Sequence, residues 1–286
     1  MRERKINSDL FYGKFAEKFL KFSKGIDFLY YAFAFNMYNN DKRQAIYAIE
    51  NNKIISTFSK YASRIRLFYS CNLKKKLNHF IFIGDSHLLN YEYLFLNKFF
   101  KNFLVLFCRI QGASSYGLNK INSSSESFKI IKKIFSNNHG NPFVFLNFGE
   151  VDCRSTLWLV KNKKRKKIDT LLSEAILNYK NLILLIQKKK YKKIILAGVH
   201  EPVWNEKNIW TKRFASYKKI KNITKKYNQK LKFVAKELNC NYFDVNEDLN
   251  LLKKHFSDLA AIKGEHHLNP QRVSKIFYNK IIRYFN

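Results

Sequence analysis

Four short apolar runs between residues 79 and 199 each end in residues that could do chemistry. The segments that follow these runs are 84–87 (Gly-Asp-Ser-His), 111–117 around Gly112, 149–154 with two carboxylates and an arginine, and His200. A serine within reach of a histidine can attack an acyl group, because the imidazole takes the hydroxyl proton. We expect Ser86 to lie near a helix N-terminus, where backbone N–H groups could stabilise an oxyanion.

The histidine that could serve Ser86 lies far along the chain, in segment 265–270 with the sequence Glu-His-His-Leu-Asn-Pro. His267 precedes a helix that we expect to start at Asn-Pro, so it could reach the serine and act as general base. His200 is a second candidate, which we interpret as a structural or substrate-side group. The adjacent histidines could also suggest a metal, but side chains at i and i+1 should diverge and no third ligand is obvious. We therefore expect no metal site.

Two carboxylates, Glu150 and Asp152, stand with Arg154 at the end of the third apolar run. Buried charges are costly unless they are paired. One interpretation is an ion pair between Arg154 and either carboxylate that holds the loop. The other is contact with the substrate or with an oxyanion. The residues alone favour neither interpretation.

Strands and amphipathic helices alternate in the part of the chain that would position these residues. Apolar runs predict strands at 79–83, 103–110, 143–148, 194–199 and 242–245, and helical spacing predicts helices at 87–101, 123–135, 168–188, 209–238 and 271–285. This alternation indicates a three-layer α/β/α domain with a mostly parallel five-stranded sheet. Because the carboxyl ends of parallel strands meet at one edge, we expect the four segments to converge there.

Residues 1–77 show a different pattern. Apolar residues have helical spacing at 11–22 and at 45–49, and a lysine run at 74–76 marks a boundary. The sequence therefore predicts an N-terminal helical extension at 1–77, ahead of the α/β domain at 78–286.

The chain of 286 residues is strongly basic, with 54 Lys and Arg against 21 Asp and Glu. The Lys-rich segments 161–167, 188–193 and 212–236 could face an anionic surface, although solvated helix faces explain them as well. No nucleic-acid-binding motif occurs, so we expect no specific nucleic-acid partner. The four cysteines show no CxxC spacing, and neither a secretory signal nor a membrane-spanning stretch is visible near the N-terminus. We expect free thiols and a cytoplasmic protein, at most peripheral to a membrane.

In order and spacing, these segments resemble the four sequence blocks of the SGNH hydrolases, also called GDSL-like esterases, over roughly residues 79–286. Gly84-Asp85-Ser86 is similar to the nucleophile block, Gly112 to the second-block glycine, Gly149 and Asp152 to the outer positions of the Gly-x-Asn-Asp block, and His267-Leu268-Asn269-Pro270 to the last block. The resemblance implies a flavodoxin-like fold, Ser86 as nucleophile, His267 as base and no cofactor. It also implies an oxyanion hole formed by the backbone N–H groups of Ser86 and Gly112.

Two positions depart from the family pattern. Val151 stands where the family has an asparagine that donates to the oxyanion, and Gly264 stands where it has an aspartate three residues before the catalytic histidine. Losing one oxyanion donor typically costs about 100- to 1000-fold in rate. Glu265 is close enough in sequence to orient the imidazole, and Glu150 or Arg154 could replace the missing groups. The residues expected near the oxyanion or substrate are Gly112, Asp85, Gly149, Glu150, Asp152 and Arg154.

The resemblance therefore implies a serine esterase or O-acyltransferase that acts on an acyl ester of a carbohydrate or a similar small substrate. The alternative is a catalytically impaired module that binds a glycan or a protein partner, which the substitutions at Val151 and Gly264 suggest. A third hypothesis is a basic protein that binds nucleic acid or an anionic membrane through its charge alone.

Overall fold

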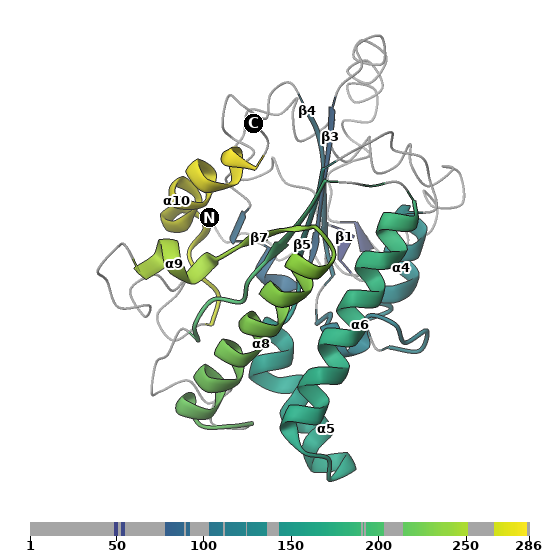
Figure 1. The fold of residues 1–286 in the computed structure, drawn as a ribbon, viewed down its shortest axis with the longest axis vertical. Coiled ribbons are helices and arrows are strands. Elements are labelled where there is room, and N and C mark those ends of the chain that lie inside the picture. The colour runs from purple at the N-terminus through teal and green to yellow at the C-terminus, as the bar shows by residue number, and fades with distance from the viewer. Residues whose placement is uncertain are drawn as a thin grey trace, which may run out of the picture.

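Five parallel strands form the central sheet in the computed structural model, in the order β4-β3-β5-β6-β7 (Figure 1). The strands are β3 (Asn78–Gly84), β4 (Phe103–Arg109), β5 (Phe143–Asn147), β6 (Lys193–Ala197) and β7 (Asn241–Phe243), and every neighbouring pair is parallel. Numbered within the sheet, this order is 2-1-3-4-5, the flavodoxin-like arrangement. The predicted fold class is confirmed.

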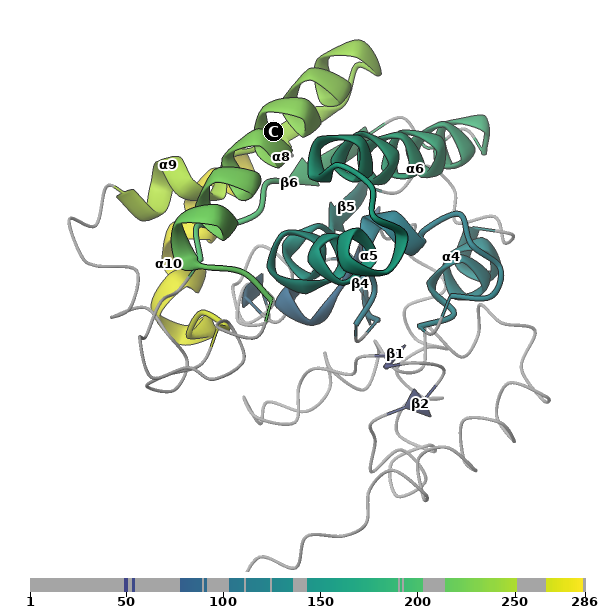
Figure 2. The same ribbon diagram turned by 90° about the horizontal axis from the view of Figure 1, so that it is seen from below.

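The structure describes residues 49–50, 53–54, 78–88, 90–91, 103–110, 112–123, 125–135, 143–189, 191, 193–202, 214–250 and 266–284. Helices cover both faces of the sheet (Figures 1 and 2). On one side lie α4 (Ser127–Phe135), α6 (Ile168–Lys188) and α8 (Tyr217–Glu237); on the other lies α10 (Pro270–Arg283), with the short α9 (Val245–Asn250) beside it. Among these described helices, none is both long and apolar enough to cross a membrane.

Aromatic side chains fill the face of the sheet that α10 covers. Phe80 stacks on Phe143 with ring centroids 4.8 Å apart, and Phe82 contacts Phe145 at 4.9 Å, because the register pairs these residues directly. This cluster continues with Tyr91, with Phe243 of β7 and with Phe277 of α10. The alternate residues of the same strands are aliphatic and point to the opposite face. Apolar side chains on both faces explain why the strands read as continuous apolar runs.

The predicted helices differ from the observed ones mainly at their starts. Helix α6 has the predicted bounds, but α4 begins at Ser127 rather than 123, because Glu126 has a left-handed backbone with φ of 48°. Helix α8 begins at Tyr217 rather than 209, because Ser216 is extended and acts as its N-cap. Residues 209–213 lie outside the described part. Helix α10 begins at Pro270, a residue well suited to the first helical position.

Some helical segments were not predicted. A π-helical turn, Asp152–Thr156, leads into α5 (Leu157–Lys164), which buries only its first turn and otherwise carries exposed lysines. The predicted strand 242–245 was wrong at its end, because Asp244 Oδ1 accepts from the backbone N–H of Asn246 at 3.0 Å and so starts α9. The predicted strand 194–199 likewise ends earlier, at Ala197.

The described residues of the N-terminal segment form a small hairpin. β1 (Ile49–Glu50) pairs antiparallel with β2 (Lys53–Ile54), and Ile49 lies opposite Ile54. The helical prediction was therefore wrong at Ile49, where a β-branched residue type favours a strand. The remainder of 1–77 lies outside the described residues. Of the predicted helix 87–101, the described residues 86–88 and 90–91 form 3₁₀ turns, and 92–101 lie outside.

Candidate active site

The segments that follow the strands meet at the carboxyl edge of the sheet, as expected. His87, after β3, has its ring centroid 5.3 Å from that of His200, which follows β6. Glu150 Oε2, after β5, lies 3.2 Å from His87 Nδ1. His267, just before α10, stacks on His87 with centroids 4.5 Å apart. The predicted convergence is confirmed for the segments that follow β3, β5 and β6, and the segment before α10 joins them.

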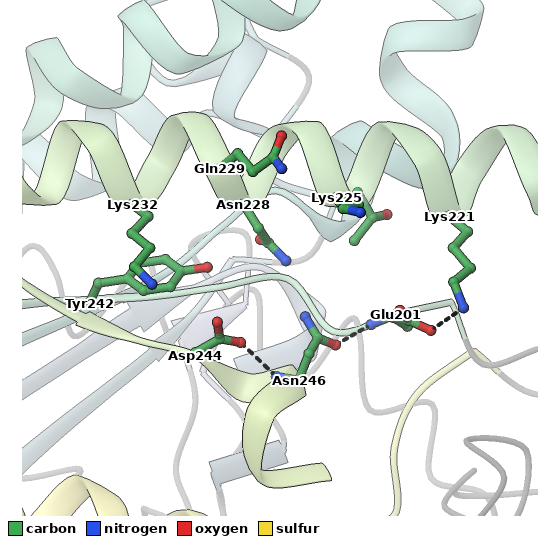
Figure 3. Close-up of a pocket in the computed structure, with 10 residues that line it drawn as sticks. Glu201, Lys221, Lys225, Asn228, Gln229, Lys232, Tyr242, Asp244 and Asn246 are labelled. Atoms are coloured by element: carbon green, nitrogen blue, oxygen red, sulfur yellow. Dashed lines mark hydrogen bonds and ion pairs between the residues drawn. The ribbon is translucent and has the colours of Figure 1, made fainter. Parts of the chain in front are cut away.

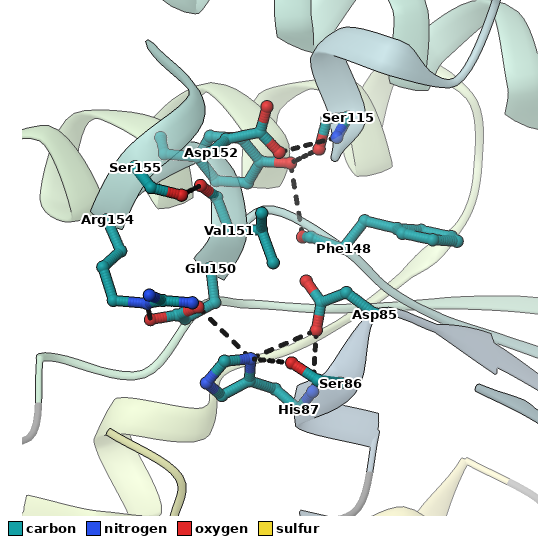
Figure 4. Close-up of polar contacts among 11 residues, drawn as sticks. Asp85, Ser86, His87, Ser115, Phe148, Glu150, Val151, Asp152, Arg154 and Ser155 are labelled. Carbon is teal, nitrogen blue, oxygen red and sulfur yellow. Dashed lines mark hydrogen bonds and ion pairs between the residues drawn. The ribbon is translucent and has the colours of Figure 1, made fainter. Parts of the chain in front are cut away.

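Ser86 lies in a tight turn held by its neighbours (Figure 4). Asp85 is buried; its N–H donates to Asn147 O at 3.0 Å, and its Oδ1 accepts from the His87 N–H at 2.8 Å. Burial, reinforced by the charge of Glu150, raises the pKa of Asp85 to about 7. Ser86 is the partly exposed residue of this turn, so its hydroxyl is accessible while its backbone is fixed.

His87 faces two carboxylates with one of its ring nitrogens. Its Nδ1 lies 3.3 Å from Asp85 Oδ1 and 3.2 Å from Glu150 Oε2. Because the carboxylate of Glu150 is ionised and its oxygens only accept hydrogen bonds, we assign the proton to Nδ1 and the lone pair to Nε2. Burial lowers the pKa of His87 to about 3, so the ring is neutral. Ser86 Oγ is 3.4 Å from the same Nδ1, which therefore cannot take the serine proton.

Glu150 is the charged group at the centre of the site. Its Oε1 accepts from Arg154 Nε at 2.8 Å, one helical turn further on. Burial alone would raise the pKa of Glu150, but Arg154 and the neighbouring histidines outweigh it and hold the pKa well below its ordinary range. Of the two ion pairs that the sequence allowed, the structure contains Glu150–Arg154. An ionised carboxylate therefore faces the histidines.

Asp152 does not pair with Arg154; it anchors the loop that follows β4. Its Oδ2 accepts from the N–H of Ser115 at 2.6 Å, and its Oδ1 accepts from the N–H of Tyr116 at 3.0 Å. Burial raises its pKa to about 7 in spite of these two hydrogen bonds. The loop also contains Gly112, whose φ of 70° suits glycine. We interpret Asp152 as a positioning residue for this loop.

Replacing Asp152 with asparagine is expected to lower the free energy of unfolding by about 2–3 kcal/mol, because an amide cannot accept from both backbone N–H groups. Urea denaturation of the variant beside wild type measures this. Asp169→Asn is the matched control, since Asp169 is exposed and pairs with Lys226 at the surface, where ion pairs are worth about 0–1 kcal/mol. Equal midpoints for both variants would contradict the anchoring role.

Tyr227 on α8 supports the loops that follow β4 and β5. No pattern in the sequence indicated a functional role for this tyrosine. Its hydroxyl is 2.5 Å from Ser115 Oγ and donates to Phe148 O at 3.3 Å. Its ring packs so closely on Gly149 that a Cβ there would overlap it. The available signal was a tyrosine on the buried stripe of a helix, where a hydroxyl needs a partner.

His266 and His267 do not diverge, contrary to the expectation for neighbouring residues. Their ring centroids are 4.1 Å apart, and both rings lie near His87. The segment is a bend rather than a strand, so the alternation of side chains does not apply. Burial lowers the pKa of His267 to about 2 and that of His266 to about 3, and the negative charge of Glu150 opposes this effect in both residues. His87 supplies the third histidine that sequence reasoning lacked.

Of the remaining predicted residues, the structure describes His200 and Val151 but not Gly264 and Glu265. His200 is buried, and its Nδ1 donates to the carbonyl of Glu201 at 2.7 Å, which fixes the tautomer and leaves the lone pair on Nε2. Val151 is buried and brings no donor to the site. Glu265 and Gly264 lie outside the described residues, so the orienting role predicted for Glu265 stays a prediction.

A cavity of about 380 Å³ lies apart from Ser86, between α8 and the ends of β6 and β7 (Figure 3). Its polar groups are largely satisfied by the protein. Asn228 and Asn246 both donate to Val199 O, and Glu201 pairs with Lys221 at 2.8 Å. By contrast, the ring nitrogens Nε2 of His87 and His200 are buried without a hydrogen-bond partner. We therefore assign the chemistry to the histidine cluster and a structural role to these asparagines.

Comparison with known proteins supports the fold. No protein-family model matches the sequence, and no curated protein matches it significantly. A gut microbial diltiazem-metabolizing enzyme is 17% identical with a TM-score of 0.50, over 72% of this chain and 47% of that enzyme. A protein from Streptococcus pneumonia named for platelet activating factor is 17% identical with a TM-score of 0.52, over 79% and 94%. An acetylxylan esterase from Geobacillus stearothermophilus is 16% identical with a TM-score of 0.50, over 73% and 94%. At these identities the similarity shows the fold alone.

Proposed function

We propose that this protein is a serine-dependent hydrolase of ester bonds, or an O-acyltransferase, with Ser86 as nucleophile and His267 as general base. The observation that carries the proposal is the position of Ser86. It is the partly exposed residue of a buried turn at the carboxyl edge, with its Oγ 3.4 Å from His87 Nδ1, and Gly84 of the same turn accepts from the N–H of Ile110, just before the loop that contains Gly112. The resemblance of four segments to the SGNH hydrolases supports the same assignment.

The proposed reaction has two acyl-transfer steps. Ser86 Oγ attacks the ester carbonyl carbon while His267 takes the hydroxyl proton. The N–H groups of Ser86 and Gly112 receive the negative oxygen, and His267 returns the proton to the departing alcohol. Water, or an acceptor hydroxyl in a transferase, then repeats the attack on the acyl-serine and restores Ser86.

Glu150 takes the place of the absent aspartate in this scheme. Its ionised carboxylate contacts His87 directly, and its charge raises the pKa of His267 against the stronger effect of burial. Because His267 becomes positively charged in the transition state, a nearby negative charge stabilises that state more than the ground state. The role predicted for Glu150 as a replacement group is thus consistent with its position.

Replacing Glu150 with glutamine is expected to lower kcat about 10- to 100-fold, because the charge is lost while the shape is kept. Glutamine can still accept from Arg154, so the loop should hold. Steady-state kinetics with p-nitrophenyl acetate measure the effect. Glu247→Gln is the control, since Glu247 is exposed and pairs with Lys280. An unchanged kcat in Glu150→Gln would remove this residue from the mechanism.

For the natural substrate we propose an acetylated carbohydrate. The support is the acetylxylan esterase of the same fold, so the idea rests on analogy. Acetylated xylooligosaccharides are the first substrates to assay, followed by other acylated glycans. The alternative, a binding module without turnover, is favoured by Val151, which leaves the oxyanion with backbone donors only.

A serine-reactive fluorophosphonate distinguishes the two functions. We expect stoichiometric labelling of the purified protein, with the adduct mapped by mass spectrometry to the peptide that contains Ser86. Ser115, which is buried and bonded to Tyr227, should remain unlabelled. An intact protein that takes up no label at Ser86 would favour the binding module over the enzyme.

A further inference from the structure

We infer that His87, His266 and His267 form a binding site for a divalent transition-metal ion of the zinc type, and that the bound ion inhibits the esterase. The site lies where the turn after β3 meets the segment before α10. One nitrogen from each ring can be chosen so that all three lie within 4.8 Å of one another. The inhibition rests on the proposed function, whereas the binding does not.

The spacing of the three nitrogens is close to what an ion requires. Zinc–nitrogen bonds of about 2.0–2.1 Å place two ligands of a tetrahedral ion about 3.4 Å apart. Nitrogens that lie within 4.8 Å of one another therefore need to approach by at most about 1.4 Å at their widest pair. His87 and His267 are stacked with 24° between their ring planes, so the His267 ring also has to turn until its lone pair points at the ion. His267 is partly exposed and lies in a bend, which leaves its ring room to turn.

The surroundings of His87 are those of a metal-binding histidine whose other ring nitrogen faces carboxylates. Its Nδ1 faces the carboxylates of Asp85 and Glu150, so its Nε2 carries a lone pair. That Nε2 is buried without a hydrogen-bond partner. Metal-binding histidines commonly donate their other N–H to a carboxylate, which fixes the tautomer and strengthens the ligand. A buried polar atom without a partner costs about 1–3 kcal/mol, and an ion would satisfy it.

Charge and ligand type favour a zinc-like ion over a hard cation. Three imidazole nitrogens suit zinc, copper, nickel or cobalt, whereas magnesium and calcium prefer oxygen. The ionised Glu150 stands beside His87 and offsets the charge of the ion, although Arg154 shares that carboxylate. With three protein ligands, a fourth position stays open to water.

The ion is expected to inhibit because one of its ligands, His267, is the proposed general base. His267 needs its lone pair to take the proton of Ser86, and a metal bond uses that lone pair. The ion also places positive charge where the mechanism needs an imidazolium to form. A zinc-loaded protein should therefore lose turnover, while the metal-free protein keeps it.

Isothermal titration calorimetry with zinc chloride, on chelator-treated and dialysed full-length protein, tests the binding without any turnover. We expect one zinc ion per chain. His266→Asn should weaken the affinity for zinc at least about 100-fold, because a ligand is lost. Replacing a residue that only orients a ligand typically weakens metal affinity about 10- to 100-fold. His79→Asn is the matched control with unchanged affinity, because His79 lies at the amino end of β3 and the site lies beyond the carboxyl end of that strand. Cobalt chloride should give the visible bands of a nitrogen-ligated ion, without a sulfur charge-transfer band.

Esterase assays test the inhibition separately, as the ratio of rates with and without zinc in each protein. We expect at least about a 10-fold loss in wild type and in His79→Asn, and a ratio near one in His266→Asn at the same zinc concentration. Absence of binding in wild type, or equal affinity in His266→Asn, would overturn the site. Binding that leaves activity unchanged, or raises it, would overturn the inhibition. Zinc binding by a protein that takes no phosphonate label would instead count against the proposed function.

Discussion

Ser86→Ala is expected to lower kcat/KM for p-nitrophenyl acetate by at least about 1000-fold, to near the background rate. The methyl side chain cannot attack the carbonyl carbon, and no acyl-serine can form. What remains is binding and oxyanion stabilisation, which alone give modest rate enhancement over water. Initial rates of purified wild type and variant, under identical conditions and with the spontaneous hydrolysis subtracted, measure the effect.

The fold should survive this replacement, because Ser86 is partly exposed and its hydroxyl lies at a long distance of 3.4 Å from His87 Nδ1. Circular dichroism and the thermal midpoint should therefore match wild type. Ser173→Ala is the matched control, since Ser173 lies exposed on α6 and bonds only to the backbone of Asp169. A Ser86→Ala protein that kept wild-type activity would exclude the proposed nucleophile. Equal background rates in both proteins would favour the binding module.

Gly149→Ala is expected to lower the free energy of unfolding by about 3 kcal/mol or more. Gly149 has φ of 121°, a conformation open essentially to glycine, and departures of this kind cost of order 1–3 kcal/mol. A Cβ would also overlap the ring of Tyr227, and overpacking a buried site costs about 1–3 kcal/mol more. Urea denaturation monitored by fluorescence measures the change.

Gly112→Ala separates these two causes. Gly112 also has a positive φ, of 70°, but a Cβ there would meet no atom within 4 Å. This variant should lose only the cost of the left-handed backbone, about 1–2 kcal/mol. If the free energy of unfolding fell by the same amount in both variants, overlap of the new Cβ with the Tyr227 ring would contribute nothing to the loss in Gly149→Ala.

The sheet could be predicted from the sequence because β3, β5 and β6 are buried on both faces over most of their length. β5 and β6 consist almost entirely of apolar residues, and α6 combines length with a clear apolar stripe, so its bounds were predicted correctly. Helix α5 escaped prediction because its exposed lysines and single buried turn give no helical period. The starts of α4 and α8 depend on the backbone angles of Glu126 and Ser216, which the apolar pattern does not encode.

The candidate site could be predicted as a meeting of loops but not as a set of contacts. Parallel strands require their carboxyl ends to meet, which placed the turn at Ser86 near 149–154 and His200. Side-chain directions within turns depend on individual dihedral angles. The sequence therefore left open whether Arg154 pairs with Glu150 or Asp152, and it placed His266 and His267 apart. Asp152, whose partners are backbone N–H groups of another loop, had no detectable signal for that role.

The π-helical turn at Asp152–Thr156 has a consequence for comparing this chain with others. The N–H of Leu157 bonds to the carbonyl of Asp152, five residues back, so the turn holds one residue more than an α-helical turn. In a regular helix, two residues five apart would point about 140° away from each other. Here Asp152 and Leu157 are both buried. A chain with a plain α-helix at this place would align with a one-residue gap, and motif searches with fixed spacing across residues 149–158 would miss the correspondence.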